Sequence, residues 1–392
     1  MKAQVLYGIG NIKYTDIEAP RPKAGEALIK VSRCGICGSD VPRVFKTGAH
    51  NMPLVPGHEF TGTVEECVLV PELVGKRVGV FPLIPCMECE QCENEHYEMC
   101  SNYNYLGSRC DGGFAEYVSV PVWNLFSLPD EVTDDEAAML EPMCVAVHAM
   151  RRAEIVSDSD LTVVVCGLGT IGLLMAMFLK DAGFTKVLFV GNKDIQKKML
   201  LEMGYSESEY CDVRYGDPTA FIKGKTNSKG ADIYFECIGR SESYVQAVNC
   251  SAPLGKVILV GNPASDMELP RDTYWKILRN QLTLKGTWNS SYCGPKPVEY
   301  STGASIALSG SSEMDDWDYA IDRLVSWKKP ECESILGRMV QEGERSSFVN
   351  FLPDRLISHR YSLENMQDGL RIMQKKSEEY IKIMIETDRV FE

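Results

Sequence analysis

The sequence predicts an α/β protein with two domains, one made mostly of antiparallel strands and one built on a doubly wound parallel sheet. Its 392 residues exceed what one hydrophobic core usually serves. Residues 26–34 and 60–70 alternate apolar and polar side chains among frequent Gly and Pro, which is typical of half-buried strands. Residues 161–192 have the pattern strand, glycine turn, long helix and strand, which indicates a βαβ unit.

The later elements extend the parallel sheet and then close the chain. Residues 231–239 and 256–261 are apolar runs that end at glycine, as expected where strand ends face a ligand. Val260 and Gly261 are therefore predicted cofactor contacts. After residue 287 a Gly/Ser/Pro-rich stretch predicts an exposed loop or insertion. Two amphipathic helices and a closing strand are expected at residues 315–329, 363–376 and 379–386.

Composition is that of an ordinary globular protein. Charged residues make up 24% and hydrophobic residues 44% of the chain, which excludes a largely disordered protein. The net charge of −14 disfavours nucleic acid or an anionic membrane surface as the main partner. The chain has neither a run of about eighteen apolar residues nor the apolar core of a signal peptide, so we expect a cytoplasmic protein with no membrane partner. In such a compartment clustered cysteines more often bind metal than form disulfides.

Residues 34–59 gather a thiol, an imidazole and carboxylates, and they predict the first half of a catalytic zinc site. Cys37 and His58 are ligands that Zn²⁺ accepts, Glu59 adds a carboxylate, and another ligand must come from elsewhere in the chain. We assign Glu141, directly or through water, because it begins a helix in apolar surroundings where a carboxylate needs a cation. Glu59 is then a switching or outer ligand. The alternative for Glu141 is a solvated helix cap.

Two neighbours of Cys37 are expected to assist this site. Asp40 is predicted to accept a hydrogen bond from the second ring nitrogen of His58 and so fix its tautomer. Its alternative is a turn residue after Gly38. Ser39 is the hydroxyl expected to lie against a zinc-bound alcohol, and its alternative is a local cap of the turn.

A second metal site is predicted by cysteine spacing alone. Two-residue gaps let a tight turn present consecutive thiolates to one ion, and four protein ligands leave no open coordination position, so the expected role is structural. An iron–sulfur cluster and plain surface thiols are the alternatives. His96 and His148 are not expected to be ligands. The four thiols are Cys86, Cys89, Cys92 and Cys100.

The glycine-rich turn after residue 166 predicts a dinucleotide site. Gly167, Gly169 and Gly172 follow an apolar strand and precede an apolar helix, the context in which a backbone approaches a pyrophosphate at a helix N-terminus. Thr170 and Ile171 fall within this turn and are included among the cofactor contacts. The alternative is an ordinary glycine turn.

The end of the second strand distinguishes the two nicotinamide cofactors. An acidic residue there would bond the adenosine ribose and favour NAD. The sequence instead offers Gly191, Asn192 and Lys193, which removes repulsion against a 2′-phosphate and adds a positive charge. NADP(H) is therefore favoured modestly over NAD(H), although Asp194 could restore NAD if the turn shifts.

Together these motifs resemble the zinc-dependent medium-chain dehydrogenases over essentially the full chain. Within that superfamily the sequence is most similar to the galactitol-1-phosphate 5-dehydrogenases and the sorbitol dehydrogenases. Besides the cysteine spacing and the glycine turn, the segments that carry the resemblance are residues 34–50, 56–62, 106–117, 141–149 and 286–292.

The resemblance implies a GroES-like catalytic domain at residues 1–146 and 288–392, interrupted by a Rossmann domain at residues 147–287. It implies two zinc ions per chain. The catalytic ion is held by Cys37, His58 and Glu141 with Glu59 close by, and the structural ion by the four cysteines. A homodimer or homotetramer is usual in the family.

The implied activity is reversible oxidation of a secondary alcohol on a polyol or polyol phosphate. Zinc would act as the Lewis acid, Ser39 would take part in proton removal, and hydride would pass to the nicotinamide. Pro42 stands where related enzymes often place a proton-relay histidine, so the proton must leave by another route, such as water. The segments near residues 292–312 and 331–351 are longer than usual.

Other functions remain open at this point. One is a simple alcohol, threonine or aromatic-alcohol dehydrogenase with the same metal sites. Another is a non-catalytic dinucleotide-binding scaffold or redox sensor. Arg109, Lys46 and Tyr292 are polar candidates for contacting the substrate or its phosphate, although exposed residues of these types usually only solvate a surface.

Overall fold

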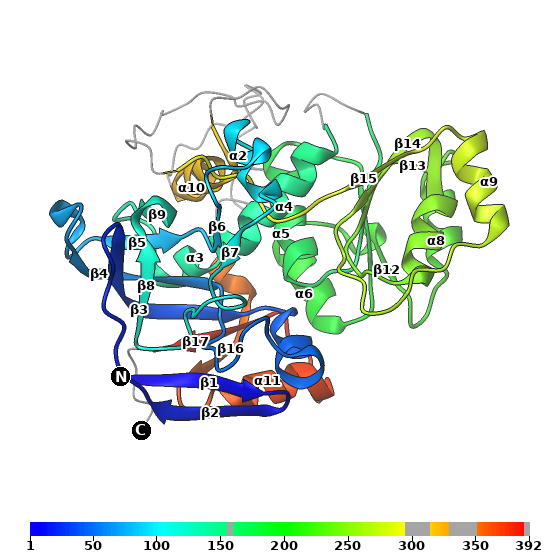
Figure 1. Cartoon of the computed structure of the whole chain (residues 1–392). Coiled ribbons are helices and arrows are strands. Elements are labelled where there is room, and N and C mark those ends of the chain that lie inside the picture. Colours follow the sequence, from blue (N-terminus) through cyan, green and yellow to red (C-terminus); the bar gives the residue numbers. More distant parts are fainter. Residues whose placement is uncertain (155–159, 295–313, 329–350, 388–392) are drawn as a thin grey trace.

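A computed structural model describes residues 1–154, 160–294, 314–328 and 351–387 of the protein, and most of the two long segments near 292–312 and 331–351 lies outside them. The chain forms two lobes side by side (Figure 1). We call them the β lobe, which contains the N-terminal 127 residues and the C-terminal strands, and the parallel-sheet lobe, which contains residues 163–286.

The β lobe is organised around a seven-stranded sheet in the order β16-β17-β3-β4-β5-β9, with β8 pairing on β3. Its first five strands in chain order pair antiparallel, and their inward side chains form one apolar core. A β1–β2 hairpin and a short β6–β7 pair complete the lobe. The strands are β1 (Lys2–Gly8), β2 (Asn11–Asp16), β3 (Glu26–Ile36), β4 (Glu59–Cys67), β5 (Arg77–Val80), β6 (Leu83–Ile84), β7 (Asn104–Tyr105), β8 (Tyr117–Pro121), β9 (Leu125–Ser127), β16 (Ile357–Ser362) and β17 (Lys382–Glu386).

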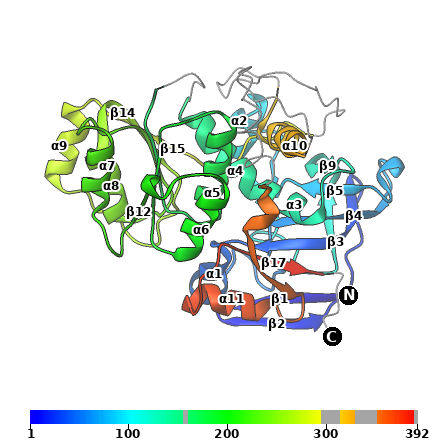
Figure 2. The same cartoon turned by 180° about the vertical axis from the view of Figure 1, so that it is seen from behind.

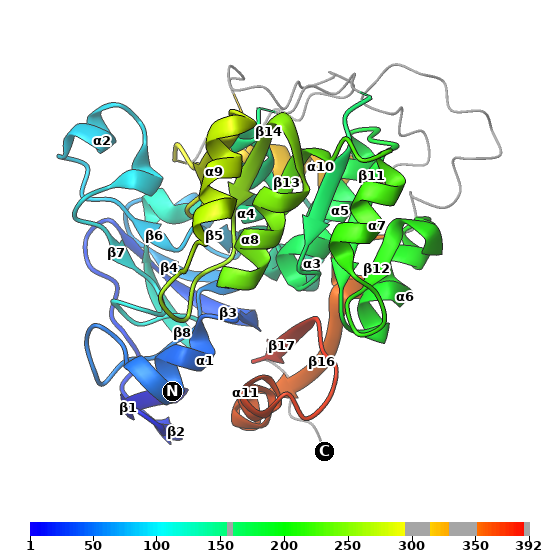
Figure 3. The same cartoon turned by 90° about the vertical axis from the view of Figure 1, so that its right-hand side faces the viewer.

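The parallel-sheet lobe has six strands in the order β12-β11-β10-β13-β14-β15, all parallel. In chain order this is 3-2-1-4-5-6, the doubly wound arrangement whose ligands bind beyond the carboxyl ends of the strands, where the order reverses between β10 and β13. In Figure 3 this lobe faces the reader and its helices surround the sheet. The strands are β10 (Val163–Cys166), β11 (Val187–Gly191), β12 (Tyr210–Asp212), β13 (Ala231–Glu236), β14 (Ser251–Leu259) and β15 (Thr283–Gly286).

The central strand β10 is buried on both faces, which explains its unbroken run of apolar residues. Val163 and Val165 pack in the core beneath α5, whereas Val164 and Cys166 pack in a separate core beneath α7 and α8. The helices are α1 (Asp40–Pro42), α2 (Glu90–Glu93), α3 (Asp134–Ala138), α4 (Leu140–Arg152), α5 (Thr170–Asp181), α6 (Asp194–Glu202), α7 (Pro218–Lys225), α8 (Ser241–Cys250), α9 (Arg271–Arg279), α10 (Asp316–Trp327) and α11 (Met366–Lys375).

The chain returns to the β lobe after β15. Strand β17 pairs antiparallel with β3, aligning Ile385 with Cys34, so the last strand of the chain joins the sheet that begins with β3. The two helices and the closing strand expected near the C-terminus are present as α10, α11 and β17 (Figure 2).

The fold class is thus confirmed, while the exact domain boundaries stay predictions. Helix α4 spans the predicted boundary at 146/147, so the predicted first junction falls within a helix. The prediction of an exposed loop after residue 287 is wrong in part, because Ser290 and Tyr292, which lie in its described first residues, are buried. No helix among the described residues is long and apolar enough to cross a membrane.

Candidate active site

The first three predicted zinc ligands come together between β3 and β4. The antiparallel register aligns Gly35 with Glu59, so Cys37, just beyond β3, lies beside His58, just before β4. One ligand atom from each of Cys37, His58 and Glu59 lies within 4.8 Å of the others. Gly35 is required by this packing, because a Cβ there would collide with the Glu59 carboxylate.

Glu141, on the first turn of α4, faces this cluster without joining its tight three-atom group. Burial raises the pKa of Glu141 to about 8, with a further contribution from Glu59 and Cys37 against an opposing one from His58. Burial likewise raises the pKa of Cys37 to about 11, helped by Glu59 and Asp40. Buried acidic groups that raise each other's pKa are relieved by a divalent cation, which binds their ionised forms. The donor set therefore fits zinc.

Asp40 and Ser39 both lie against the cluster. Asp40 is fully buried and accepts hydrogen bonds from the Cys37 backbone amide at 3.0 Å and from the Arg43 guanidinium. Its Oδ1 lies 3.7 Å from Nδ1 of His58, beyond hydrogen-bond length, and that Nδ1 has no partner among the described residues. The predicted His58–Asp40 hydrogen bond is not formed at this distance. The Ser39 hydroxyl lies near the Cys37 sulfur and opposes the rise in the pKa of Cys37.

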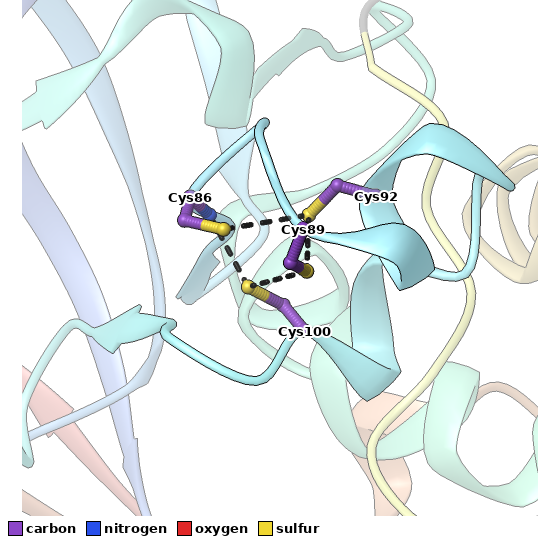
Figure 4. A group of neighbouring side chains, drawn as sticks. All are labelled: Cys86, Cys89, Cys92 and Cys100. Atoms are coloured by element: carbon purple, nitrogen blue, oxygen red, sulfur yellow. Dashed lines mark hydrogen bonds between the residues drawn. The ribbon is translucent and has the colours of Figure 1, made fainter.

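The four cysteines form a compact group on the loop that contains α2 (Figure 4). Their sulfurs are separated by 4.0 Å (Cys86–Cys92), 3.5 Å (Cys89–Cys92) and 3.9 Å (Cys89–Cys100). Zinc with four sulfur ligands at about 2.3 Å requires sulfurs about 3.8 Å apart in a tetrahedron. Backbone amides of Ser101 and Cys92 lower the pKa of Cys89 to about 5, which favours the thiolate that a metal binds.

The glycine turn has the geometry that a pyrophosphate requires. Gly167 has a φ of 96°, and a Cβ there would lie 2.6 Å from Ile238. Gly169 caps α5, and a Cβ built on it would meet nothing within 4 Å, so this backbone is open to a ligand. Gly172 packs against the Gly167 carbonyl, as the third glycine should for close helix–strand packing.

Comparison with known proteins agrees with this geometry. Residues 23–130 match the alcohol dehydrogenase GroES-like domain, and residues 170–305 match the zinc-binding dehydrogenase domain. The chain is 32% identical to galactitol 1-phosphate 5-dehydrogenase of Escherichia coli K12, over 90% of this chain and 94% of that one. The chain belongs to the zinc-dependent medium-chain dehydrogenases.

The names of two further relatives of this dehydrogenase state a different substrate and a bound cofactor. L-threonine 3-dehydrogenase of Deinococcus deserti is 29% identical over 70% of this chain and 79% of that one. A crystal structure of a zinc-binding dehydrogenase from Sinorhizobium meliloti bound to NADP is 25% identical, with a TM-score of 0.76, covering 98% of this chain and 99% of that one. The protein is therefore a polyol or alcohol dehydrogenase of this superfamily.

A lysine that sequence reasoning missed stands beside the dehydrogenase's metal cluster. Lys382, the first residue of β17, is 3% exposed, pairs with the Glu59 carboxylate and donates to the Ile36 carbonyl at 3.3 Å. Burial alone would lower the pKa of Lys382, but Glu59, Cys37 and Glu141 raise it above its ordinary value. Its only sequence signal is a charged residue within the apolar closing strand.

Tyr105 and Asn289 were also missed, and they meet each other at this site. The Tyr105 hydroxyl lies 3.4 Å from Oε1 of Glu141 and 3.4 Å from the side-chain Oδ1 of Asn289, and its ring meets the His58 ring edge-on at 5.8 Å. Asn289 has a φ of 53°, in the left-handed region that asparagine tolerates better than most residues. Nothing in the sequence around Tyr105 marked it as a functional residue.

The side chains that surround Gly191, at the end of β11, were not predicted from the sequence. A Cβ on Gly191 would lie 2.7 Å from the Gln196 amide and 2.9 Å from the Tyr210 ring. Gln196 Oε1 accepts from the backbone amides of Asn192 and Lys193 at 3.0 and 3.2 Å. The space where an acidic side chain would stand is thus filled by neutral groups.

Four other predicted cofactor contacts have partners within the protein. The Thr170 hydroxyl donates to the carbonyl of Ile381 in the β lobe at 2.8 Å. The Val260 and Gly261 amides both donate to the Glu236 carbonyl, at 2.8 and 2.9 Å. Ile171 packs at the edge of the lobe's core.

The three polar residues predicted as possible substrate contacts differ in their burial and in their partners. Tyr292 is buried in an aromatic cluster, where its hydroxyl donates to the Leu125 carbonyl at 3.0 Å, so it belongs to the core. Arg109 stacks on Tyr103 with its guanidinium 4.1 Å from the ring centroid. Lys46 is exposed near the end of the short helix that follows α1.

Proposed function

We propose that this dehydrogenase reversibly oxidises a secondary alcohol of a polyol or polyol phosphate with NADP(H) as the preferred cofactor. The observation that carries the proposal is the meeting of Cys37, His58 and Glu59 beside Glu141. The similarity to galactitol 1-phosphate 5-dehydrogenase over nearly the whole chain supports the substrate class.

The chain's own residues have distinct parts in this reaction. Cys37, His58 and Glu141 would hold a zinc ion, which supplies Lewis-acid polarisation of the substrate oxygen. Ser39, two residues from Cys37, is the hydroxyl that takes part in removing the alcohol proton. Lys382 holds Glu59 in an ion pair, so Glu59 acts as an outer group and not as a permanent ligand. The structural zinc would be held by Cys86, Cys89, Cys92 and Cys100.

The parallel-sheet lobe binds the cofactor, which supplies the hydride acceptor. The turn from Gly167 to Gly172 receives the pyrophosphate at the N-terminus of α5. The absence of a carboxylate at Gly191 and the nearby Lys193 favour a 2′-phosphate, and the NADP-bound relative is in line with this preference. Homo-oligomerisation and a cytoplasmic location stay predictions of the family resemblance and the composition.

An activity screen with matched variants tests the reaction. The purified enzyme is assayed with galactitol 1-phosphate, sorbitol, threonine and simple secondary alcohols, and with both cofactors. Cys37→Ala should abolish turnover and remove one zinc per chain while leaving the circular dichroism spectrum unchanged. Cys110→Ala, a half-buried cysteine outside both metal groups, is the control. Wild-type activity in Cys37→Ala would exclude the proposed mechanism, and turnover of threonine alone would exclude the substrate class.

Cofactor preference is tested at Asn192 and not at Gly191, because a side chain on Gly191 would displace Gln196 and Tyr210. Asn192 is exposed, so Asn192→Asp adds a carboxylate at constant size. Like charges at close range cost at least about a factor of ten in affinity. The NADP/NAD ratio of kcat/KM should fall about tenfold, whereas Asn192→Ser should leave it nearly unchanged. An unchanged ratio in Asn192→Asp would place the 2′-phosphate elsewhere.

A further inference from the structure

We propose that Glu379 determines cofactor specificity: its carboxylate, supplied by the β lobe, stands at the turn that would receive the 2′-phosphate of NADP(H) and weakens binding of that cofactor. The inference rests on the proposed dehydrogenase function. It predicts that any preference for NADP(H) over NAD(H) is modest.

Glu379 reaches this turn from the far end of the sequence. It lies three residues before β17 begins at Lys382, and its oxygens accept from the backbone amides of Asp194 at 3.2 Å and Ile195 at 3.0 Å. These are the first two residues of α6, which follows β11 directly. In doubly wound folds the adenosine ribose binds at the end of this second strand. The Glu379 carboxylate is therefore close to where the two cofactors differ.

The carboxylate brings to this turn the negative charge that the sequence lacks at Gly191. In the usual arrangement an acid at the strand end bonds the ribose hydroxyls and repels a 2′-phosphate. A helix N-terminus attracts anions through its free amides and dipole. Since Glu379 already occupies the first amides of α6, a phosphate approaching this turn would have to face that anion or displace it.

The nearby cations are engaged as well. Lys193 donates to the Tyr380 carbonyl at 3.4 Å, and its ammonium lies 4.4 Å from the centroid of the Tyr380 ring. Arg214 is paired with Asp194 and Asp212. A 2′-phosphate must therefore draw Lys193 away from the same short segment that carries Glu379. The segment at residues 379–380 thus opposes NADP(H) both by its charge and by holding a lysine.

Glu379→Gln tests this directly, because glutamine keeps an oxygen acceptor for the α6 amides and loses the charge. Dissociation constants of NADP⁺ and NAD⁺ are measured by calorimetry on the zinc-loaded enzyme. We expect the NADP⁺ affinity to rise roughly five- to twentyfold at low salt and the gain to shrink at about 0.5 M salt, as for an exposed charge pair. NAD⁺ affinity should change less than about twofold.

Glu378→Gln is the matched control, since this neighbouring carboxylate is exposed and lies 3.4 Å from His359 instead of the α6 amides. It should leave both affinities unchanged. An equal change in both affinities in Glu379→Gln would show that Glu379 only caps α6. Unchanged affinities would show that its charge is too far from the bound cofactor. Either result overturns the proposal. Failure of the wild-type enzyme to oxidise any polyol would contradict the proposed function without altering this affinity ratio.

Discussion

Replacing Lys382 by methionine tests the electrostatic balance of the metal site. The Lys382 and Glu59 side chains are 3% and 2% exposed, so both charges are shielded from bulk water. Removing one partner of a buried ion pair typically costs about 3–5 kcal/mol, because the other charge is left buried without compensation. Lys382→Met leaves Glu59 in that state beside the acidic groups of Cys37 and Glu141. We expect a loss of about 3–5 kcal/mol in the free energy of unfolding.

The assay is urea denaturation of the chelator-treated enzyme, in which no zinc compensates the Glu59 charge, completed by a double-mutant cycle. Lys30→Met, an exposed lysine on the adjoining strand β3, should change stability by less than about 0.5 kcal/mol. The double variant Lys382→Met/Glu59→Gln should regain at least half of the loss, since both charges are gone. If Lys382→Met is as stable as Lys30→Met, or if the two substitutions are additive, the buried pair does not stabilise the site.

Three further outcomes are expected. Gly169→Ala should weaken cofactor affinity at least about tenfold by placing a methyl group in the open turn, with the stability of the cofactor-free enzyme retained; Gly224→Ala, equally open but in α7, should leave affinity unchanged. Loss of stability without loss of affinity would contradict this. Cys89→Ser should lower the zinc content by one ion per chain, and an unchanged content would exclude the structural site. Burial raises the pKa of Asp181 to about 6, so the folded state binds the extra proton, and stability should fall as pH rises from about 4 to about 6. Asp181→Asn should flatten that slope in thermal melts at successive pH values, and an unaltered slope would assign it to other groups.

The features that were predictable from sequence are those fixed by short spacing. The four cysteines fall within fifteen residues, and a tight turn leaves their thiols few arrangements other than one cluster. The glycine turn was predictable for the same reason, because strand, glycines and helix are contiguous. The meeting of Cys37 with His58 also follows from local pairing, since β3 and β4 are neighbours in sequence and in the sheet.

What the sequence could not provide is the set of charges that arrive from far along the chain. Lys382 and Glu59 are 323 residues apart, and only the pairing of β17 with β3 brings them together. Glu379 is 185 residues from its partner Asp194. Gln196 is close to Gly191 in sequence, but nothing in its type shows that its amide fills the place of an acid. The spacing of residues in the sequence predicts the candidate metal ligands, whereas the strand order of the sheets determines which charged side chains surround them.

The start of the last strand and the residues before it connect the candidate metal site with the glycine turn. Lys382 enters the metal site at the start of β17, and Glu379 meets the first amides of α6 three residues earlier, which is about 10 Å of extended chain. Between them the Ile381 carbonyl accepts from Thr170 in the glycine turn. Four consecutive residues therefore contact the group of Cys37, His58 and Glu59, the glycine turn and the turn at the end of β11. Because the doubly wound sheet is inserted within the β lobe, the chain must return past the cofactor edge to finish that lobe, and its closing segment is placed to connect both sites.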